Sequence, residues 1–228
     1  MQNKHNFEPI IAYDNCWIER ESHTSFLGLS IDDSLSWDEH VHKLLRKLNS
    51  GIYALSKMSF LCNTQILRQI YFSFIHSHLA YGLCLYGSTK QANLDNILKV
   101  QKKAVRIILN LNKCESVRQH FQSLKILTVY GQYILDTVTL HKFKIRDCGS
   151  PSSLHQNHKY NTRNRSEIIP THHLSFYTKK PTYAGLKFYK YIPATIKKEN
   201  DINIFKNKLK NYLVNKVIYS FNDLLLEK

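Results

Sequence analysis

The sequence is poor in the residues that break or cross-link a chain. Its 228 residues include only 7 glycines, 5 prolines and 5 cysteines. The glycines form neither a GxGxxG pattern nor a P-loop, so neither kind of phosphate-cradling loop is present. The cysteines are far apart and include no CxxC pair, which indicates reduced thiols rather than a disulfide framework.

Long hydrophobic runs are also missing. No apolar run approaches the 18 residues of a membrane span, and the first residues, MQNKHNFEP, lack the apolar segment of a signal peptide. We therefore expect an intracellular protein, in the nucleus or the cytoplasm, with no membrane partner.

Motifs that carry chemistry are absent as well. There is no GxSxG and no HExxH, and the close histidine pairs among the 12 histidines have no cysteine or acidic partner at a zinc-site spacing. Asp32 and Asp33 form an adjacent acidic pair, but nothing upstream supplies a third acid, so we interpret the pair as a turn leading into a helix. The sequence predicts no catalytic residues, no metal site and no cofactor.

Positive charge is what the chain has in excess. Residues 1–40 carry 2 basic and 8 acidic groups (−6), residues 41–148 carry 16 and 4 (+12), and residues 149–228 carry 14 and 5 (+9), which sums to the net +15. A field of this sign favours a polyanionic partner, above all a nucleic acid. The acidic first 40 residues could dock onto the basic remainder and mask it.

The charge is most ordered between residues 93 and 111. At about 100° per residue, the apolar residues and Gln101 fall on one side of a predicted helix. The other side carries a basic row without any acid: Lys99, Lys102, Lys103 and Arg106. Such a row can lie along a sugar-phosphate backbone.

Further helices are predicted on both sides of this one. Ser36 and Glu39 form a capping box before a helix whose exposed face carries a second basic row, Lys43, Arg46 and Lys47. Gly51 in this helix marks close packing. The remaining predicted helices span residues 63–79, 116–124, 128–143, 182–191 and 202–218. The 80–87 segment, AYGLCLYG, is apolar on all sides and predicted to be buried.

Two segments do not follow a helical period. Residues 7–35 resemble short strands, the clearest at 24–31. Residues 154–181 are polar, basic and aromatic, which predicts an irregular arm in which Arg163 and Arg165 are candidate phosphate contacts. No RRM, zinc-finger or recognition-helix signature accompanies them, so we expect backbone binding without sequence readout.

Seven landmarks in one order resemble the C-terminal part of a non-LTR, jockey-like retrotransposon reverse transcriptase. They are FLGLSIDDSLSWDEHV at 26–41, LAYGLCLYG at 79–87, LDNILKVQKKAVRII at 94–108, LKILTV at 124–129, YNTRN at 160–164, YAGLKFYKYIPATIK at 183–197 and FKNKLKNYL at 205–213. Tyr86 and Tyr189 depart from the resemblance, because relatives often have tryptophan there.

The resemblance implies a polymerase thumb and the region that follows it. Phe26, Leu27 and Gly28 would then form a primer-grip-like segment beside a palm, and the palm with its catalytic aspartates is not in this sequence. The expected fold is mainly α, a helical thumb-like bundle with a small N-terminal β-hairpin or short strands and an irregular basic arm before the C-terminal helices. The expected parts are 1–35 (β remnant), 36–148 (thumb-like domain), 149–181 (arm) and 182–228 (C-terminal helical segment).

The expected function is non-catalytic binding of RNA, DNA or an RNA–DNA duplex through its backbone. Two alternatives remain open. The chain could be one part of a split reverse transcriptase that a palm-containing polymerase chain completes, or a protein-interaction module or inert relic whose basic faces are only soluble surface.

Overall fold

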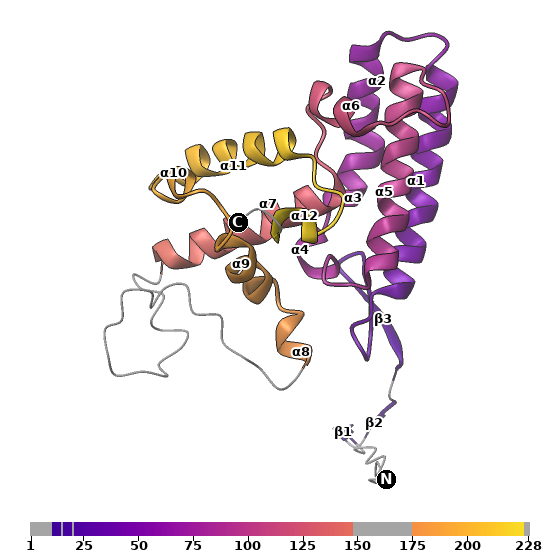
Figure 1. Ribbon diagram of the computed structural model, residues 1–228. Helices are drawn as coiled ribbons and strands as arrows, with labels where there is room; N and C mark the ends of the chain where they lie inside the picture. Colours follow the sequence, from indigo (N-terminus) through magenta and orange to yellow (C-terminus); the bar gives the residue numbers. More distant parts are fainter. Residues whose placement is uncertain (1–10, 15, 20, 148–174, 226–228) are drawn as a thin grey trace, which may run out of the picture.

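The computed structural model describes residues 11–14, 16–19, 21–147 and 175–225. The described chain is mainly helical with two small antiparallel strand pairs near its N-terminus, as the sequence predicted (Figure 1). The strands are β1 (Ile11–Tyr13), β2 (Cys16–Ile18), β3 (His23–Phe26) and β4 (Leu29–Asp32). The helices up to the undescribed segment are α1 (Asp38–Met58), α2 (Thr64–Tyr71), η1 (Phe72–His76), α3 (Ser77–Ala80), α4 (Leu83–Tyr86), α5 (Gln91–Leu109), α6 (Arg118–Ser123) and α7 (Val129–Asp147). Those after it are α8 (Ser175–Thr178), α9 (Pro181–Tyr189), α10 (Ala194–Lys197), α11 (Ile202–Lys216) and α12 (Asn222–Leu225).

Strands β3 and β4 form a hairpin where a single strand was predicted at 24–31. The chain reverses at Leu27 and Gly28, whose φ angles of 47° and 77° are both positive. Two left-handed residues in a two-residue loop match the twist of the flanking strands. The prediction missed the turn because leucine rarely adopts this conformation.

The start of α1 also differs from the prediction. Trp37, with a φ of 64°, precedes the helix, and the predicted box of Ser36 and Glu39 forms only in part: Ser36 Oγ accepts the Asp38 N–H at 3.3 Å, but Glu39 does not accept the Ser36 N–H. Instead, the Asp32 carboxylate accepts the N–H groups of Ser36 (2.9 Å) and Trp37 (3.1 Å), while Glu39 lies 3.5 Å from Lys43. Asp32 therefore belongs to the turn into a helix, as interpreted from the sequence.

Three helical rods pack side by side: α1, the continuous α2–η1–α3 segment, and α5 (Figure 1). The middle rod buries Leu67, Tyr71, Ile75 and Leu79, which are spaced by four residues. In a regular α-helix, residues spaced by four would shift gradually around the helix and leave the buried face. The π-helical turn η1 in the middle of the rod has more residues per turn and compensates for this shift. The predicted close packing at Gly51 is confirmed, because a Cβ there would lie 2.9 Å from Ile75 Cγ1.

The segment 80–87 is only partly buried, contrary to the prediction. Leu83 and Tyr86 are buried, and the Tyr86 hydroxyl donates to the Leu79 carbonyl at 2.5 Å. Tyr81 and Leu85 are exposed. The left-handed Gly82, with a φ of 66°, separates α3 from α4 within this segment.

The C-terminal helices assemble on α7. Helix α7 packs most extensively against α9 and then α11, on the far side from α1 (Figure 1). Helix α7 falls within the expected part 36–148, whereas α11 and all of α9 except its first residue, Pro181, fall within 182–228. The described end of the expected arm, 175–181, contains the short helix α8, while Arg163, Arg165 and the rest of residues 148–174 lie outside the described residues.

A single hydrophobic cluster runs through both groups of helices. Polar contacts cross between them: the Thr128 hydroxyl donates to the Ile218 carbonyl at 2.5 Å, and Arg118 donates to the Val217 carbonyl at 3.3 Å. The basic helix α5 lies between α1 and this junction and is therefore supported on two sides.

Candidate nucleic-acid interface

Helix α5 separates its charge from its apolar face as its sequence pattern predicts. Leu94, Ile97, Leu98, Ala104, Val105 and Ile108 are buried, and so is Gln101. Burial of this stripe orients the opposite face outward, because residues three or four positions apart share a face. The packing of α5 therefore fixes which way the basic row faces.

Lys99 and Lys103 form the fully open half of the row. Both side chains are exposed, and Lys99 Nζ donates to Asn96 Oδ1 of the same helix at 3.1 Å. Lys103 makes no hydrogen bond or ion pair with any residue that the structure describes. Both ammonium groups are available to an anionic ligand.

Lys102 and Arg106 point instead toward the C-terminal residues. Lys102 Nζ lies 4.1 Å from the centre of the Tyr219 ring, and the Arg118 guanidinium lies 5.2 Å from the same ring. Arg106 Nη2 donates to the Glu115 carbonyl at 3.1 Å, and its buried Nε has no hydrogen-bond partner. The row thus continues into a cationic cluster in which Lys102 and Arg118 lie over one aromatic ring and the charge of Arg106 acts on both Lys102 and Tyr219.

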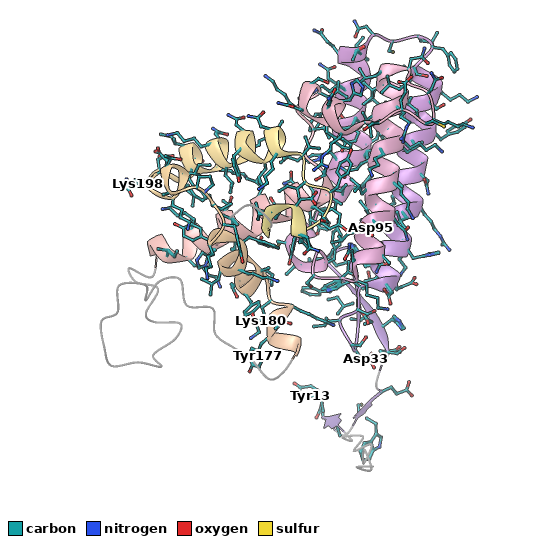
Figure 2. The ribbon with its side chains drawn as sticks, in the orientation of Figure 1. Tyr13, Asp33, Asp95, Tyr177, Lys180 and Lys198 are labelled. Atoms are coloured by element: carbon teal, nitrogen blue, oxygen red, sulfur yellow. The ribbon has the colours of Figure 1, made fainter. Side chains whose placement is uncertain are left out.

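This cluster is short of negative charge. Partial burial, together with the neighbouring Arg106 and Arg118, lowers the pKa of Lys102, although Asp95 acts in the opposite direction. Asp223 lies 3.5 Å from Arg118, and Asp95, labelled in Figure 2, accepts a hydrogen bond from the Tyr130 hydroxyl. A phosphate group beside Lys102 would relieve the repulsion between these cations.

The second predicted row does not extend the first. Lys43 and Lys47 line a cleft beside the β3–β4 hairpin and α3, whereas Arg46 is exposed on α1 outside that lining. Lys43 Nζ donates to Ser30 Oγ at 3.0 Å. The structure therefore places the two rows on different flanks of the bundle, with α5 facing Tyr219 and α1 facing the hairpin.

The predicted primer-grip-like residues lie at the tip of the hairpin. Phe26 and Leu27 are 62% and 72% exposed, and Gly28 completes the turn. The Tyr81 hydroxyl donates to the Leu27 carbonyl at 2.5 Å and so fixes the tip against the end of α3. Two large apolar side chains are held outward at a defined position.

Sequence reasoning missed Arg118 and Tyr219 as members of the cationic cluster. Arg118 precedes Tyr219 by about 100 positions in the chain, and no local pattern links either residue to α5. Only the packing of the C-terminal residues against α5 brings them together.

In the described ranges, no group of three or more histidine, cysteine, aspartate or glutamate side chains is placed to hold a metal ion. No helix in these ranges is long and apolar enough to cross a membrane. Comparisons of the chain with protein-family models, with curated proteins and with solved structures found no match.

Proposed function

We propose that this protein binds the sugar-phosphate backbone of an RNA, DNA or RNA–DNA duplex through α5 and has no catalytic activity of its own. The observation that carries the proposal is the outward face of α5, where Lys99, Lys102, Lys103 and Arg106 are held by a buried opposite face and continue toward Arg118. Cations in a row along a rigid helix contact successive phosphates without reading bases.

The resemblance of the sequence to a reverse transcriptase thumb supports the same function. A thumb holds the template–primer duplex by its shape, and the wide, shallow minor groove of A-like duplexes displays backbone groups to such a surface. The proposed ligand is therefore a duplex, with an RNA–DNA hybrid as the first to test.

Salt dependence of binding is the test. Each phosphate neutralised contributes roughly 0.9 to the slope of log affinity against log salt. The variant in which Lys99, Lys102, Lys103 and Arg106 are all alanine should lower the slope by roughly 3.6 units. Lys102 and Arg106 also contact Tyr219 and Glu115, so a milder variant, Lys99→Gln with Lys103→Gln, separates binding from folding and should lower the slope by roughly 1.8.

The matched control is Lys206→Gln with Lys210→Gln on α11, which removes the same charge from another exposed surface. A slope that falls equally in the control and in the α5 variant would contradict a localised interface. A wild-type chain that retains no nucleic acid at moderate salt would favour a protein-interaction module or an inert relic instead.

A second candidate function is completion of a palm-containing polymerase chain. The exposed tip residues Phe26 and Leu27 favour it, because apolar side chains held outward at a fixed hairpin are typical of a contact surface. Mixing the protein with such a chain and measuring template-directed nucleotide incorporation tests it. Incorporation should fall with Phe26→Ser and Leu27→Ser, while the α5-dependent salt slope should not change.

A further inference from the structure

A cleft of about 350 Å³ lies between the β3–β4 hairpin, α1 and the end of α3. Its volume is at the lower end of the range of small-molecule sites in proteins. Ser30 and Gly28 line it from the hairpin, Lys43 and Lys47 from α1, and His78 from α3. Among the residues that the structure describes, no carboxylate lines it.

The charge of the cleft is only partly compensated. Lys43 lies 3.5 Å from Glu39 of its own helix, which stands outside the lining. Lys47 forms neither a hydrogen bond nor an ion pair with the described part of the chain. At least one full positive charge therefore faces the cleft without a counter-charge.

A buried histidine, His40, also belongs to the lining of the cleft. His40 is only 8% exposed, and its Nδ1 accepts the Ser30 N–H at 3.4 Å. The ring proton of the neutral imidazole then sits on Nε2, which has no hydrogen-bond partner. Burial, together with Lys47 and Lys43, lowers the pKa of His40 and keeps the ring in this neutral form at neutral pH.

The walls of the cleft are held in place before any ligand arrives. The hydroxyl of the lining residue Tyr81 donates to the Leu27 carbonyl of the hairpin, and Lys43 Nζ donates to Ser30 Oγ. Figure 1 shows the hairpin at the base of the bundle, below α1 and α5. Because these walls are already fixed, binding does not carry the entropic cost of ordering a flexible loop.

We infer that this cleft binds a phosphomonoester, with Lys43, Lys47 and His78 around the phosphate oxygens. A terminal phosphate carries about −1.5 to −2 charges at neutral pH, more than an internal phosphodiester, and so suits an enclosed site with paired lysines. A concave site also accepts the end of a strand, whereas the open row of α5 suits a continuous backbone. The inference goes beyond the proposed function, since it separates Lys43 and Lys47 from the duplex-binding surface.

The phosphate could come from the 5′ end of a nucleic-acid strand or from a free nucleotide, and the experiment distinguishes these sources. Binding of the full chain is measured with two short single-stranded oligonucleotides of one sequence, one 5′-phosphorylated and one 5′-hydroxyl, and AMP is added as a competitor. The phosphorylated strand should bind about tenfold more tightly, the effect of one charge-assisted contact. Competition by AMP would identify a free nucleotide as a source of the phosphate. A preference for the 5′-phosphorylated strand that AMP does not reduce would identify the end of a strand as the source.

Lys43→Gln with Lys47→Gln should abolish the preference and leave the affinity for the 5′-hydroxyl strand within about twofold, because one subsite is lost and the α5 row is retained. Lys99→Gln with Lys103→Gln should weaken both strands and keep the ratio between them. Far-UV circular dichroism confirms that these exposed substitutions leave the fold intact. Equal binding of both strands by the wild type without competition by AMP would overturn the inference. If Lys99→Gln with Lys103→Gln leaves the affinity for both strands unchanged while the preference for the phosphorylated strand remains, only the proposed function is overturned.

Discussion

Gln101 shows how one polar side chain can organise a core. It is fully buried, and its Nε2 donates to the Tyr71 hydroxyl (2.8 Å) and the Leu127 carbonyl (3.0 Å), while its Oε1 accepts the Val129 N–H (2.7 Å). It therefore ties α5 to α2 and satisfies a free N–H at the start of α7. Its position in the apolar stripe of α5 was predicted, but these partners are 26 to 30 residues away in the chain and were not.

Gln101→Leu should lower the free energy of unfolding by about 3 kcal/mol, because it leaves the Val129 N–H and the Leu127 carbonyl buried without partners. Urea unfolding followed by circular dichroism measures the loss. Gln69→Leu on the exposed surface of α2 is the control and should change stability by less than about 0.5 kcal/mol. Equal effects of the two substitutions would show that the network contributes nothing.

Asp136 makes the stability of the protein depend on pH. Burial raises its pKa to about 6, against the opposing hydrogen bond from Gln132 and the charge of Lys206. The folded chain therefore holds a proton that the unfolded chain releases near pH 3.8, so the free energy of unfolding should fall as pH rises from about 4 to 6. Two pKa units correspond to up to about 3 kcal/mol.

Asp136→Asn should remove this loss, since the amide resembles the protonated acid and its oxygen can still accept from Gln132. The variant should be more stable than the wild type at pH 7 and equal to it near pH 4. Comparing the two proteins at each pH cancels the contribution of the histidines. A constant difference across the pH range would show that Asp136 does not titrate there.

At the scale of whole elements, the contact between α7 and α9 is set by a glycine. A Cβ at Gly185 would lie 2.3 Å from the Thr137 carbonyl oxygen and 2.9 Å from His141 Cβ. Gly185→Ala should therefore push the helices apart and cost about 2 kcal/mol, after the gain of about 1 kcal/mol in helix propensity.

Gly131→Ala in α7 is the matched control. Its Cβ would meet the flexible end of Leu127 at 3.3 Å, and the gain in helix propensity offsets this contact, so thermal unfolding should change little. A Gly185→Ala protein as stable as the control would show that the helices can separate without loss.

The helices were predictable where apolar residues recur at helical spacing over several turns. Helices α5, α7 and α11 begin within about two residues of the predicted positions, because an apolar stripe must face the core wherever the chain packs. Three local features were not predictable from periodicity. The left-handed conformation of Leu27 depends on the packing of the hairpin, and that of Trp37 on its hydrogen bond to the Asp32 carboxylate. The π-turn η1 depends on which side chains of its rod are buried. In the candidate interface, periodicity placed Lys99 and Lys103 outward, but it could not show Lys102 beside Tyr219 or Lys43 in a cleft.

At the scale of the molecule, the question is whether the bundle and the C-terminal helices unfold as one unit. The hydrophobic cluster is continuous between them, and hydrogen bonds from Thr128 and Arg118 cross the junction. Neither group can separate from the other without exposing apolar side chains of the shared cluster to water, which favours a single cooperative transition.

Trp37 and far-UV circular dichroism report on different parts of this unit. Trp37 is buried in the bundle, whereas Trp17 is 73% exposed, so Trp17→Phe isolates the signal of the bundle. The fluorescence and dichroism curves in urea should coincide, and Thr128→Val should shift both to lower urea by the same amount, because its lost bond to the Ile218 carbonyl weakens the one junction that both signals depend on. Curves that separate, with dichroism lost before Trp37 fluorescence changes, would show that the C-terminal helices unfold alone and that Lys102 can leave Tyr219 while the bundle stays folded. In that case the cations of α5 would bind a duplex as a free row and not as part of a cluster with Arg118.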